Sequence, residues 1–272
     1  MLAFAHSIAS EMGPRSDYPD TLLPTIINAE QMTKIQLVLV PGLLCDAQLW
    51  APQVAHLADI ADIWIADHTR SNTMKGVARD VLADAPFANF ALAGLSMGGY
   101  IALEIMRQAP QRVTRLALLD TAATAELREQ TERRMALIAL AERGEFLRVA
   151  EILLPLSVHP SRLAERALSD VFKSMAENTG REAFVRQQHA IMSRADSVGL
   201  LSTIDCATLV LCGRQDALTP LARHEDIAAA IAGALLVIIE DCGHLSTLEK
   251  PDEVNTALRR WLARLANHGP TN

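Results

Sequence analysis

The segment at residues 87–110, FANFALAGLSMGGYIALEIMRQAP, joins an apolar run to a helix-like repeat through a turn of small residues. The run at residues 90–93 has the character of a buried strand, and apolar side chains recur at helical spacing after the turn. Between the two stand Gly94, Ser96 and Gly98. Because glycine lets neighbouring backbone approach closely, the sequence predicts a sharp strand-to-helix turn with the serine at its apex.

Such a turn holds the serine hydroxyl beyond the carboxyl end of the sheet. The N-terminus of the following helix directs N–H groups and a partial positive charge at the same point, which favours a developing oxyanion. We therefore interpret Gly94, Ser96 and Gly98 as a nucleophile elbow, with Gly99 allowing the start of the helix to pack closely.

Short apolar runs alternate with helix-period segments over most of the chain. Several runs are apolar at consecutive positions, which is typical of strands buried on both faces of a parallel sheet. The alternation predicts an α/β fold with a doubly wound, mostly parallel sheet. The six predicted strands are residues 35–40, 60–66, 90–93, 113–119, 208–212 and 235–239.

Residues 121–200 break this alternation, because they contain only helix-period stretches punctuated by glycine and proline. We predict a helical cap inserted after the fourth strand, over one end of the sheet. The α/β core then comprises residues 34–120 and 201–266, with an N-terminal extension at 1–33 and a tail at 267–272.

The composition is that of a globular protein, with 272 residues of which 50% are hydrophobic and 21% charged. A net charge of −7 argues against nucleic acid or an anionic membrane as a partner. The longest uncharged apolar run, residues 231–239, is too short to cross a bilayer. Four cysteines without a C-x-x-C pair predict reduced thiols in a cytoplasmic protein.

A serine hydroxyl becomes a good nucleophile only when a base takes its proton. Of the eight histidines, His244 in IIEDCGHLSTLEKPDEV lies between an apolar strand and the last amphipathic helix. It is therefore expected at the same sheet edge as Ser96 and is the predicted base. For His189, in the insertion, a packing or surface role is favoured. The others are predicted at the termini (His6, His268) or at solvated helix ends and loops (His56, His68, His159, His224).

The base must be oriented by a carboxylate. Asp216 in TLVLCGRQDALTP also follows an apolar strand, and the order Ser, Asp, His is the one expected for this kind of sheet. Asp120 ends another strand and is the rival, although a capping or anchoring role at the start of the insertion is favoured. Asp241 is a weaker rival because it lies too near His244 in the chain.

The oxyanion needs two backbone donors. One is predicted to be the N–H of Met97, immediately after the nucleophile. The other should come from the turn in VLVPGLLCD, where Gly42 allows close approach. Leu43 is the predicted donor, with Leu44 as the alternative.

The motifs GLSMGG, GRQDALTP and DCGHLSTLEKP, with a helical insertion between the first two, resemble the cap-containing serine hydrolases of the α/β-hydrolase fold superfamily. The resemblance covers residues 34–266 and points to the pimeloyl-carrier methyl esterase, enol-lactonase and meta-cleavage-product hydrolase branches. It implies an acyl-serine mechanism with Ser96 as nucleophile. Many relatives carry His-Gly where this chain has Pro41-Gly42, which changes how the oxyanion turn is braced.

The favoured function is hydrolysis of a small or medium, largely apolar carboxylic ester or lactone. Residues 121–200 hold 11 basic and 11 acidic residues, so a free small molecule is preferred over an acidic carrier protein. A carbon–carbon bond hydrolase of the meta-cleavage type is the alternative, although Leu245 stands where those relatives usually have tryptophan. A ligand-binding protein without turnover is the alternative from another class.

No metal, nucleotide or flavin is needed for this chemistry, and no cofactor is expected. The chain has no G-x-G-x-x-G opening a βαβ unit and no P-loop lysine. The sequence leaves open the physiological substrate, its enantioselectivity and the oligomeric state.

Overall fold

A computed structural model describes residues 34–264 of the chain. The predicted extension at 1–33 and the tail at 267–272 lie outside the described residues. Six strands form one sheet in the order β2-β1-β3-β4-β5-β6, and every neighbouring pair is parallel. The strands are β1 (Ile35–Val40), β2 (Ala61–Ile65), β3 (Phe90–Leu95), β4 (Val113–Leu119), β5 (Ala207–Gly213) and β6 (Leu235–Ile239).

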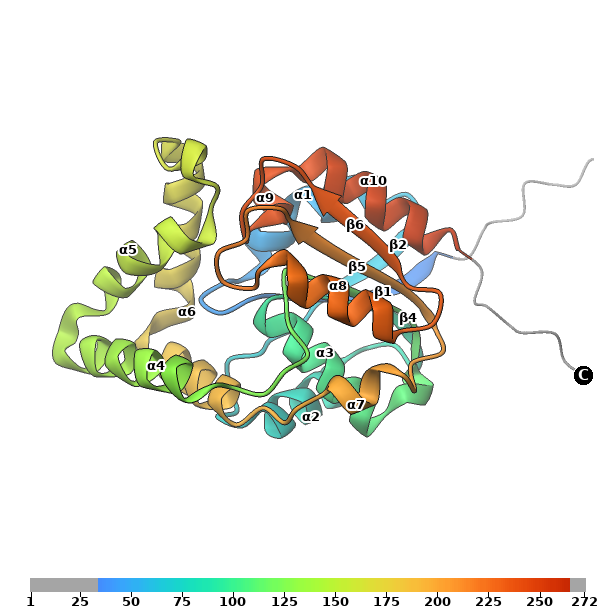
Figure 1. Ribbon diagram of the computed structural model, residues 1–272, viewed down its shortest axis with the longest axis horizontal. Coiled ribbons are helices and arrows are strands. Elements are labelled where there is room, and N and C mark those ends of the chain that lie inside the picture. The colour runs from blue at the N-terminus through green and yellow to red at the C-terminus, as the bar shows by residue number, and fades with distance from the viewer. Residues whose placement is uncertain (1–33, 265–272) are drawn as a thin grey trace, which may run out of the picture. The chain divides into compact units, whose positions relative to one another are not determined.

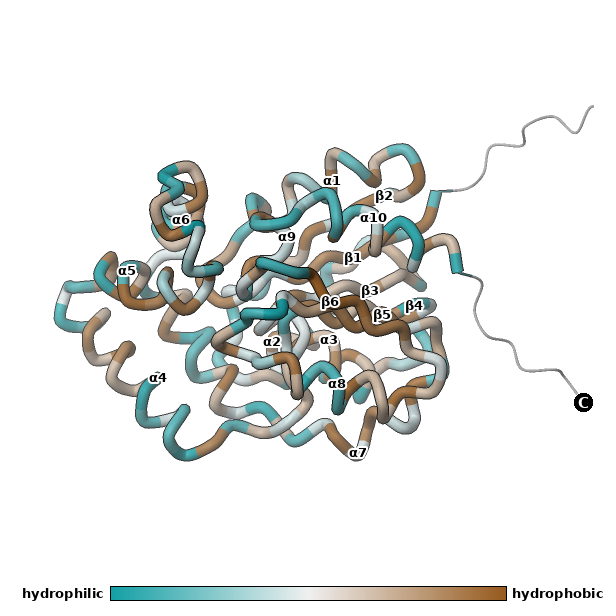
Figure 2. The backbone as a smooth tube through the Cα atoms, turned by 45° about the horizontal axis from the view of Figure 1, so that its top comes forward, coloured by the Kyte–Doolittle hydropathy of each residue, from teal (hydrophilic) through white to brown (hydrophobic). Residues whose placement is uncertain are grey.

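All six predicted strands are confirmed, and so is the doubly wound α/β fold. Every residue of β3 and β5 is buried, which explains why these strands are apolar at consecutive positions. Figure 2 shows the same pattern, with hydrophobic colour running along the central strands. β3 extends two residues beyond the predicted run at 90–93, up to the residue before Ser96.

Helices cover both faces of the sheet (Figure 1). On one face α1 (Ala51–Leu57) and α10 (Pro251–Leu262) pack against side chains such as Leu37 and Leu39 of β1. The alternate residues of β1, Val38 and Val40, belong to the core on the other face. There they pack with α2 (Met74–Asp84), α3 (Met97–Gln108) and α8 (Leu221–Ala230).

The chain between β4 and β5 contains helices only, as predicted. Figure 1 shows α4, α5 and α6 at the carboxyl end of the strands, beside the sheet rather than on either face. We call residues 121–200 the cap, and these limits remain a prediction. Its elements are α4 (Arg128–Leu140), η3 (Ala141–Glu145), α5 (Phe146–Ser157), η4 (Pro160–Arg162), α6 (Arg166–Met192) and α7 (Val198–Leu201).

Short elements complete the fold. They are η1 (Ala47–Trp50) after β1, η2 (Pro110–Arg112) before β4, and α9 (Ser246–Glu249) before α10. Among the helices within residues 34–264, none is long and apolar enough to cross a membrane.

Candidate active site

Ser96 stands in the sharp turn between β3 and α3. Its φ of 57° lies in the range that residues with side chains rarely adopt. A β-carbon on Gly94 would overlap the carbonyl group of Gly98, and one on Gly98 would overlap the carbonyl oxygen of Val40. The two glycines therefore allow the turn to close against β1, and the Ser96 residue stays partly exposed.

The side chains of Ser96, His244 and Asp216 form a continuous chain of hydrogen bonds. His244 Nε2 lies 2.8 Å from Ser96 Oγ, and His244 Nδ1 lies 2.7 Å from Asp216 Oδ2. Asp216 also accepts hydrogen bonds from the N–H groups of Leu218 and Thr219, at 2.8 and 2.9 Å. The structure thus brings together the three side chains predicted as nucleophile, base and acid.

Burial and charge act in opposite directions on the two titratable side chains. Burial would lower the pKa of His244, but the charge of Asp216 and its hydrogen bond to the ring raise that pKa overall. Burial would raise the pKa of Asp216, yet the charge of His244 and the hydrogen bonds from His244 and Thr219 lower it. The ionised Asp216 favours the tautomer with Nδ1 protonated, which leaves Nε2 to accept the serine proton.

The cap contacts the loop that carries His244. The carbonyl oxygen of Ser157, at the end of α5, accepts hydrogen bonds from the N–H groups of His244 and Leu245, at 3.2 and 3.0 Å. The buried carboxyl group of Glu249 accepts a hydrogen bond from the N–H of His159, at 2.7 Å. These bonds connect the backbone around the predicted base to the cap.

The turn after β1 packs directly against the nucleophile. A β-carbon on Gly42 would lie 3.4 Å from Ser96 Cβ, which is ordinary contact distance. In this turn the N–H of Leu44 donates to the side-chain oxygen of Gln187 on α6, at 3.2 Å. The Leu44 donor is therefore occupied before any substrate binds.

The N–H groups of Leu43 and Met97 have no hydrogen-bond acceptor within residues 34–264. Met97 is the first residue of α3, where the helix dipole adds a partial positive charge. The arrangement therefore favours Leu43 over Leu44 as the second oxyanion donor.

Asp120, the rival acid, is buried at the end of β4 but forms no hydrogen bond with His244 in the described chain. Its Oδ1 accepts a hydrogen bond from the N–H of Gly213, at 2.9 Å, and its Oδ2 accepts one from the hydroxyl of Ser246. The predicted capping or anchoring role at the start of the insertion was therefore wrong, because this carboxyl group bonds to the last residue of β5 and the first residue of α9.

Backbone strain concentrates at this edge of the sheet. In the described chain, four non-glycine residues have a positive φ, and each lies after a different strand: β1, β3, β4 or β6. In that order they are Leu44 (60°), Ser96 (57°), Asp120 (45°) and Asp241 (49°). Such conformations persist only where the surroundings hold them, and they cluster at functional sites. Their position agrees with a functional site at the carboxyl edge of the sheet.

Two histidines predicted to be solvated are buried, so those predictions were wrong. His68 is 2% exposed and its Nε2 lies 2.9 Å from the carbonyl oxygen of Gly42. His224 is fully buried on α8, where Nε2 accepts a hydrogen bond from the N–H of Thr121 at 2.8 Å. Burial lowers the pKa of His224 to about 4, so the ring stays neutral. His189 is exposed, in agreement with the favoured surface role.

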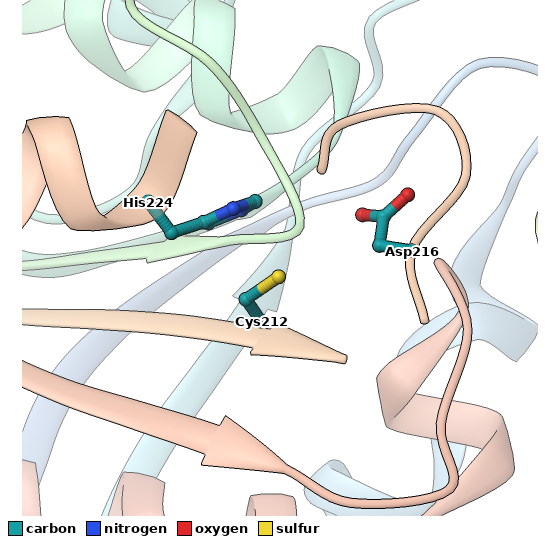
Figure 3. Close-up of side chains that lie close together, drawn as sticks. All are labelled: Cys212, Asp216 and His224. Atoms are coloured by element: carbon teal, nitrogen blue, oxygen red, sulfur yellow. The ribbon is translucent and has the colours of Figure 1, made fainter. Parts of the chain in front are cut away.

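His224 also belongs to a cluster with Cys212 and Asp216 whose donor atoms all lie within 4.8 Å of one another. Figure 3 shows the three side chains converging from α8, the end of β5 and the loop after it. Burial raises the pKa of the Cys212 thiol above its ordinary value and keeps the thiol protonated. A cation here would have to compete with His244 for the Asp216 carboxylate.

A parallel sheet with a helical cap and a Ser–His–Asp chain at its carboxyl edge defines the class of α/β hydrolases. The chain belongs to the alpha/beta hydrolase family, whose family model matches residues 37–257. Several similar proteins, described next, are named for hydrolytic reactions. The family and these relatives together support hydrolysis as the reaction class.

A curated relative is RutD from Rhizobium rhizogenes, which carries the name of a carbamate hydrolase. It is 27% identical over 241 residues, covering 83% of this chain and 92% of that protein. A thermophilic esterase from Thermogutta terrifontis is similar in structure, with a TM-score of 0.78, 29% identity and coverage of 85% and 90%. The enol-lactonase from Burkholderia xenovorans LB400 has a TM-score of 0.77, 25% identity and coverage of 85% and 92%.

Proposed function

We propose that this protein is a serine hydrolase that cleaves a small or medium, largely apolar carboxylic ester or lactone through an acyl-serine intermediate. The observation that carries the proposal is the hydrogen-bonded chain from Ser96 through His244 to Asp216, with bonds of 2.8 and 2.7 Å. This arrangement supports proton transfer from Ser96 to His244, because the two side chains are within hydrogen-bond distance and the Ser96 residue is partly exposed.

In the first half of the reaction, Ser96 Oγ attacks the carbonyl carbon while His244 Nε2 takes the hydroxyl proton. The carbonyl oxygen becomes an oxyanion and accepts hydrogen bonds from the N–H groups of Leu43 and Met97. When the intermediate collapses, the bond to the leaving oxygen breaks and His244 donates its proton to the departing alcohol.

In the second half, water attacks the acyl-serine carbonyl while His244 takes the proton of that water. Collapse returns the proton to Ser96 Oγ and releases the carboxylic acid. Asp216 holds the ring orientation and stabilises the imidazolium in both halves.

Exposed apolar side chains in the cap support an apolar substrate. Of the eight large apolar residues that are exposed within the described chain, seven belong to the cap. Relatives named as an esterase and an enol-lactonase support the same bond type. The seven cap residues are Leu127, Met135, Leu147, Ile152, Leu156, Leu163 and Val198.

Carbamate hydrolysis is the second candidate, favoured by the similarity to RutD over 83% of this chain. A carbamate has the same electrophilic carbonyl carbon, so the same attack by Ser96 applies. The two candidates differ in the group attached to the carbonyl and therefore in substrate preference.

The test is hydrolysis of p-nitrophenyl esters from acetate to decanoate, beside a p-nitrophenyl carbamate, by the native protein and by Ser96→Ala. Ser202→Ala, at an exposed serine, is the matched control. We expect Ser96→Ala to lose about 10³-fold or more in turnover, and the control to keep it. An optimum along the ester series would measure the size of the acyl site.

Retained turnover in Ser96→Ala would contradict the assignment of the nucleophile. Turnover of the carbamate but not of the esters would favour the second candidate. Labelling of Ser96 by a fluorophosphonate without any turnover would indicate a narrower substrate, and lactones and vinylogous diketones would be tested next. Absence of both labelling and turnover would favour the non-catalytic ligand-binding alternative.

A further inference from the structure

The turn that supplies the second oxyanion donor is strained. The carbonyl oxygen of Gly42 accepts a hydrogen bond from the N–H of Cys45, at 3.2 Å, so Leu43 and Leu44 are the two central residues. Leu44 has a φ of 60°, a conformation that normally favours glycine. A strained turn keeps its shape only if neighbouring groups hold it.

Two buried side chains from distant parts of the sequence contact this turn. Gln187 is fully buried on α6, and its Oε1 accepts the hydrogen bond of the Leu44 N–H at 3.2 Å. His68, in the loop between β2 and α2, has its Nε2 2.9 Å from the carbonyl oxygen of Gly42. The same Nε2 lies 3.0 Å from Gln187 Nε2, so the two side chains meet beside the turn.

The hydrogen-bonding capacity of His68 and Gln187 determines which of their contacts with the turn is present in both tautomers of His68. A neutral imidazole nitrogen cannot donate to Gly42 and accept from Gln187 at the same time, so each tautomer of His68 forms one of these bonds. The bond from Leu44 is independent of that choice, because a backbone N–H must face the amide oxygen of Gln187. Gln187 therefore holds Leu44 in both tautomers.

We propose that Gln187 is a positioning residue for the oxyanion hole: its amide oxygen holds the Leu44 N–H and so directs the neighbouring Leu43 N–H toward the substrate carbonyl. The proposal rests on the proposed function. Because Gln187 belongs to the cap, correct placement of the cap becomes a condition for a complete oxyanion hole. His68 contacts the other side of the turn, where its Nε2 lies 2.9 Å from the carbonyl oxygen of Gly42.

The adjacent residue provides a matched control. Gln188 is also fully buried on α6, but its side-chain oxygen accepts from Arg134 within the cap, at 2.8 Å, and it forms no bond with the oxyanion turn. Gln187→Met removes the acceptor while keeping a side chain of similar length, and Gln188→Met makes the same change one position along. If Gln187→Met does not fold, Gln187→Asn keeps a buried amide that is too short to reach Leu44.

Three quantities are measured for each variant: kcat on a p-nitrophenyl ester, its pH profile, and hydrogen exchange of the Leu44 amide. We expect Gln187→Met to lower kcat by about 10- to 100-fold, below the ~10²–10³-fold cost of deleting an oxyanion donor outright. The pH midpoint should stay unchanged because His244 is untouched. Exchange at Leu44 should become faster, and Gln188→Met should keep kcat within about twofold.

An equal kcat in Gln187→Met and the native protein, or an equal loss in Gln188→Met, would overturn the proposal. If the native protein shows no Ser96-dependent turnover, the proposed function fails, and exchange at Leu44 decides the positioning role alone. Faster exchange in Gln187→Met would then support the contact with the turn, and unchanged exchange would refute it.

Discussion

The carboxyl group of Asp120 accepts a hydrogen bond from the hydroxyl of Ser246, two residues beyond His244. Its other oxygen accepts the N–H of Gly213, the last residue of β5 before the loop that carries Asp216. Because β4 lies between β3 and β5, this one side chain connects the loops of the predicted base and acid to a central strand.

Replacement of Asp120 should show whether stability and turnover depend on the hydrogen bonds of this side chain or on its charge. Burial, followed by the negative charge of Asp216, raises the pKa of Asp120 to about 8, so the group is largely protonated at neutral pH. Asp120→Asn imitates that neutral form, and we expect near-native stability and turnover at pH 7. Asp120→Ala leaves Gly213 and Ser246 without their partner, which should cost about 1–3 kcal/mol for each group in urea unfolding. Equal losses in both variants would contradict this.

The same carboxyl group makes stability depend on pH with a definite sign. Its pKa in the folded protein is above the usual value of 3.8, so the folded state binds more protons than the unfolded state between about pH 4 and 8. This group therefore lowers the free energy of unfolding as pH rises through that window. The native protein should lose stability relative to Asp120→Asn between pH 5 and 8 in thermal unfolding. Parallel curves for the two proteins would show that Asp120 is ionised throughout.

The charge of Asp216 should be visible in the pH profile of turnover. The base must be neutral to accept the serine proton, and Asp216 raises the pKa of His244 above its ordinary 6.5. Activity should therefore rise with pH through that raised value. Asp216→Asn removes the charge, so the midpoint of kcat/KM should move to lower pH, and maximal kcat should fall by about 10³–10⁴-fold. If the pH profile stayed unchanged in Asp216→Asn but shifted in Asp120→Asn, the residue that orients His244 would be Asp120 instead of Asp216.

Local patterns were sufficient to predict the strands and the three interacting side chains. A parallel sheet places the carboxyl ends of its strands at one edge, so Ser96, Asp216 and His244 could be brought together from their positions after apolar runs alone. β1, β4 and β6 have the predicted limits because each run ends where buried apolar positions give way to polar or turn residues.

Contacts made by folding of the cap could not be predicted in the same way. Gln187 lies 143 residues from Leu44, and a glutamine on a helix carries no signal of a distant backbone partner. His68 and His224 were expected in solvent because their places in the sequence fit helix ends or loops. Their burial depends on which elements pack over them, which is a property of the tertiary fold.

Packing at the turn should make glycine obligatory at position 98. A β-carbon there would overlap the Val40 carbonyl, which belongs to the rigid strand β1 and cannot move aside. We expect Gly98→Ala to lose about 3 kcal/mol or more of unfolding free energy, or to fail to fold. Gly199→Ala is the control, because a β-carbon at Gly199 would meet no atom within 4 Å. A stable, active Gly98→Ala protein would refute the close approach of the turn to β1.

A buried ion cluster joins the two ends of the cap. The carboxyl group of Glu126, with its side chain 3% exposed, pairs with Arg134 at 2.6 Å and with Arg194. Arg194 also lies over the ring of Tyr100 on α3, 4.5 Å from its centre. Burial lowers the pKa of both guanidinium groups, because the charged form loses contact with water.

Glu126→Gln keeps the shape of this cluster and removes its only negative charge, leaving two guanidinium groups without compensation. Loss of one partner from a buried ion pair costs about 3–5 kcal/mol, so we expect a loss of that order in urea unfolding. Glu132→Gln removes an exposed partner of Arg128, whose ion pair is 3.0 Å long, and should change stability by less than about 0.5 kcal/mol. Similar small effects in both variants would mean that water reaches the Glu126 cluster and solvates its charges.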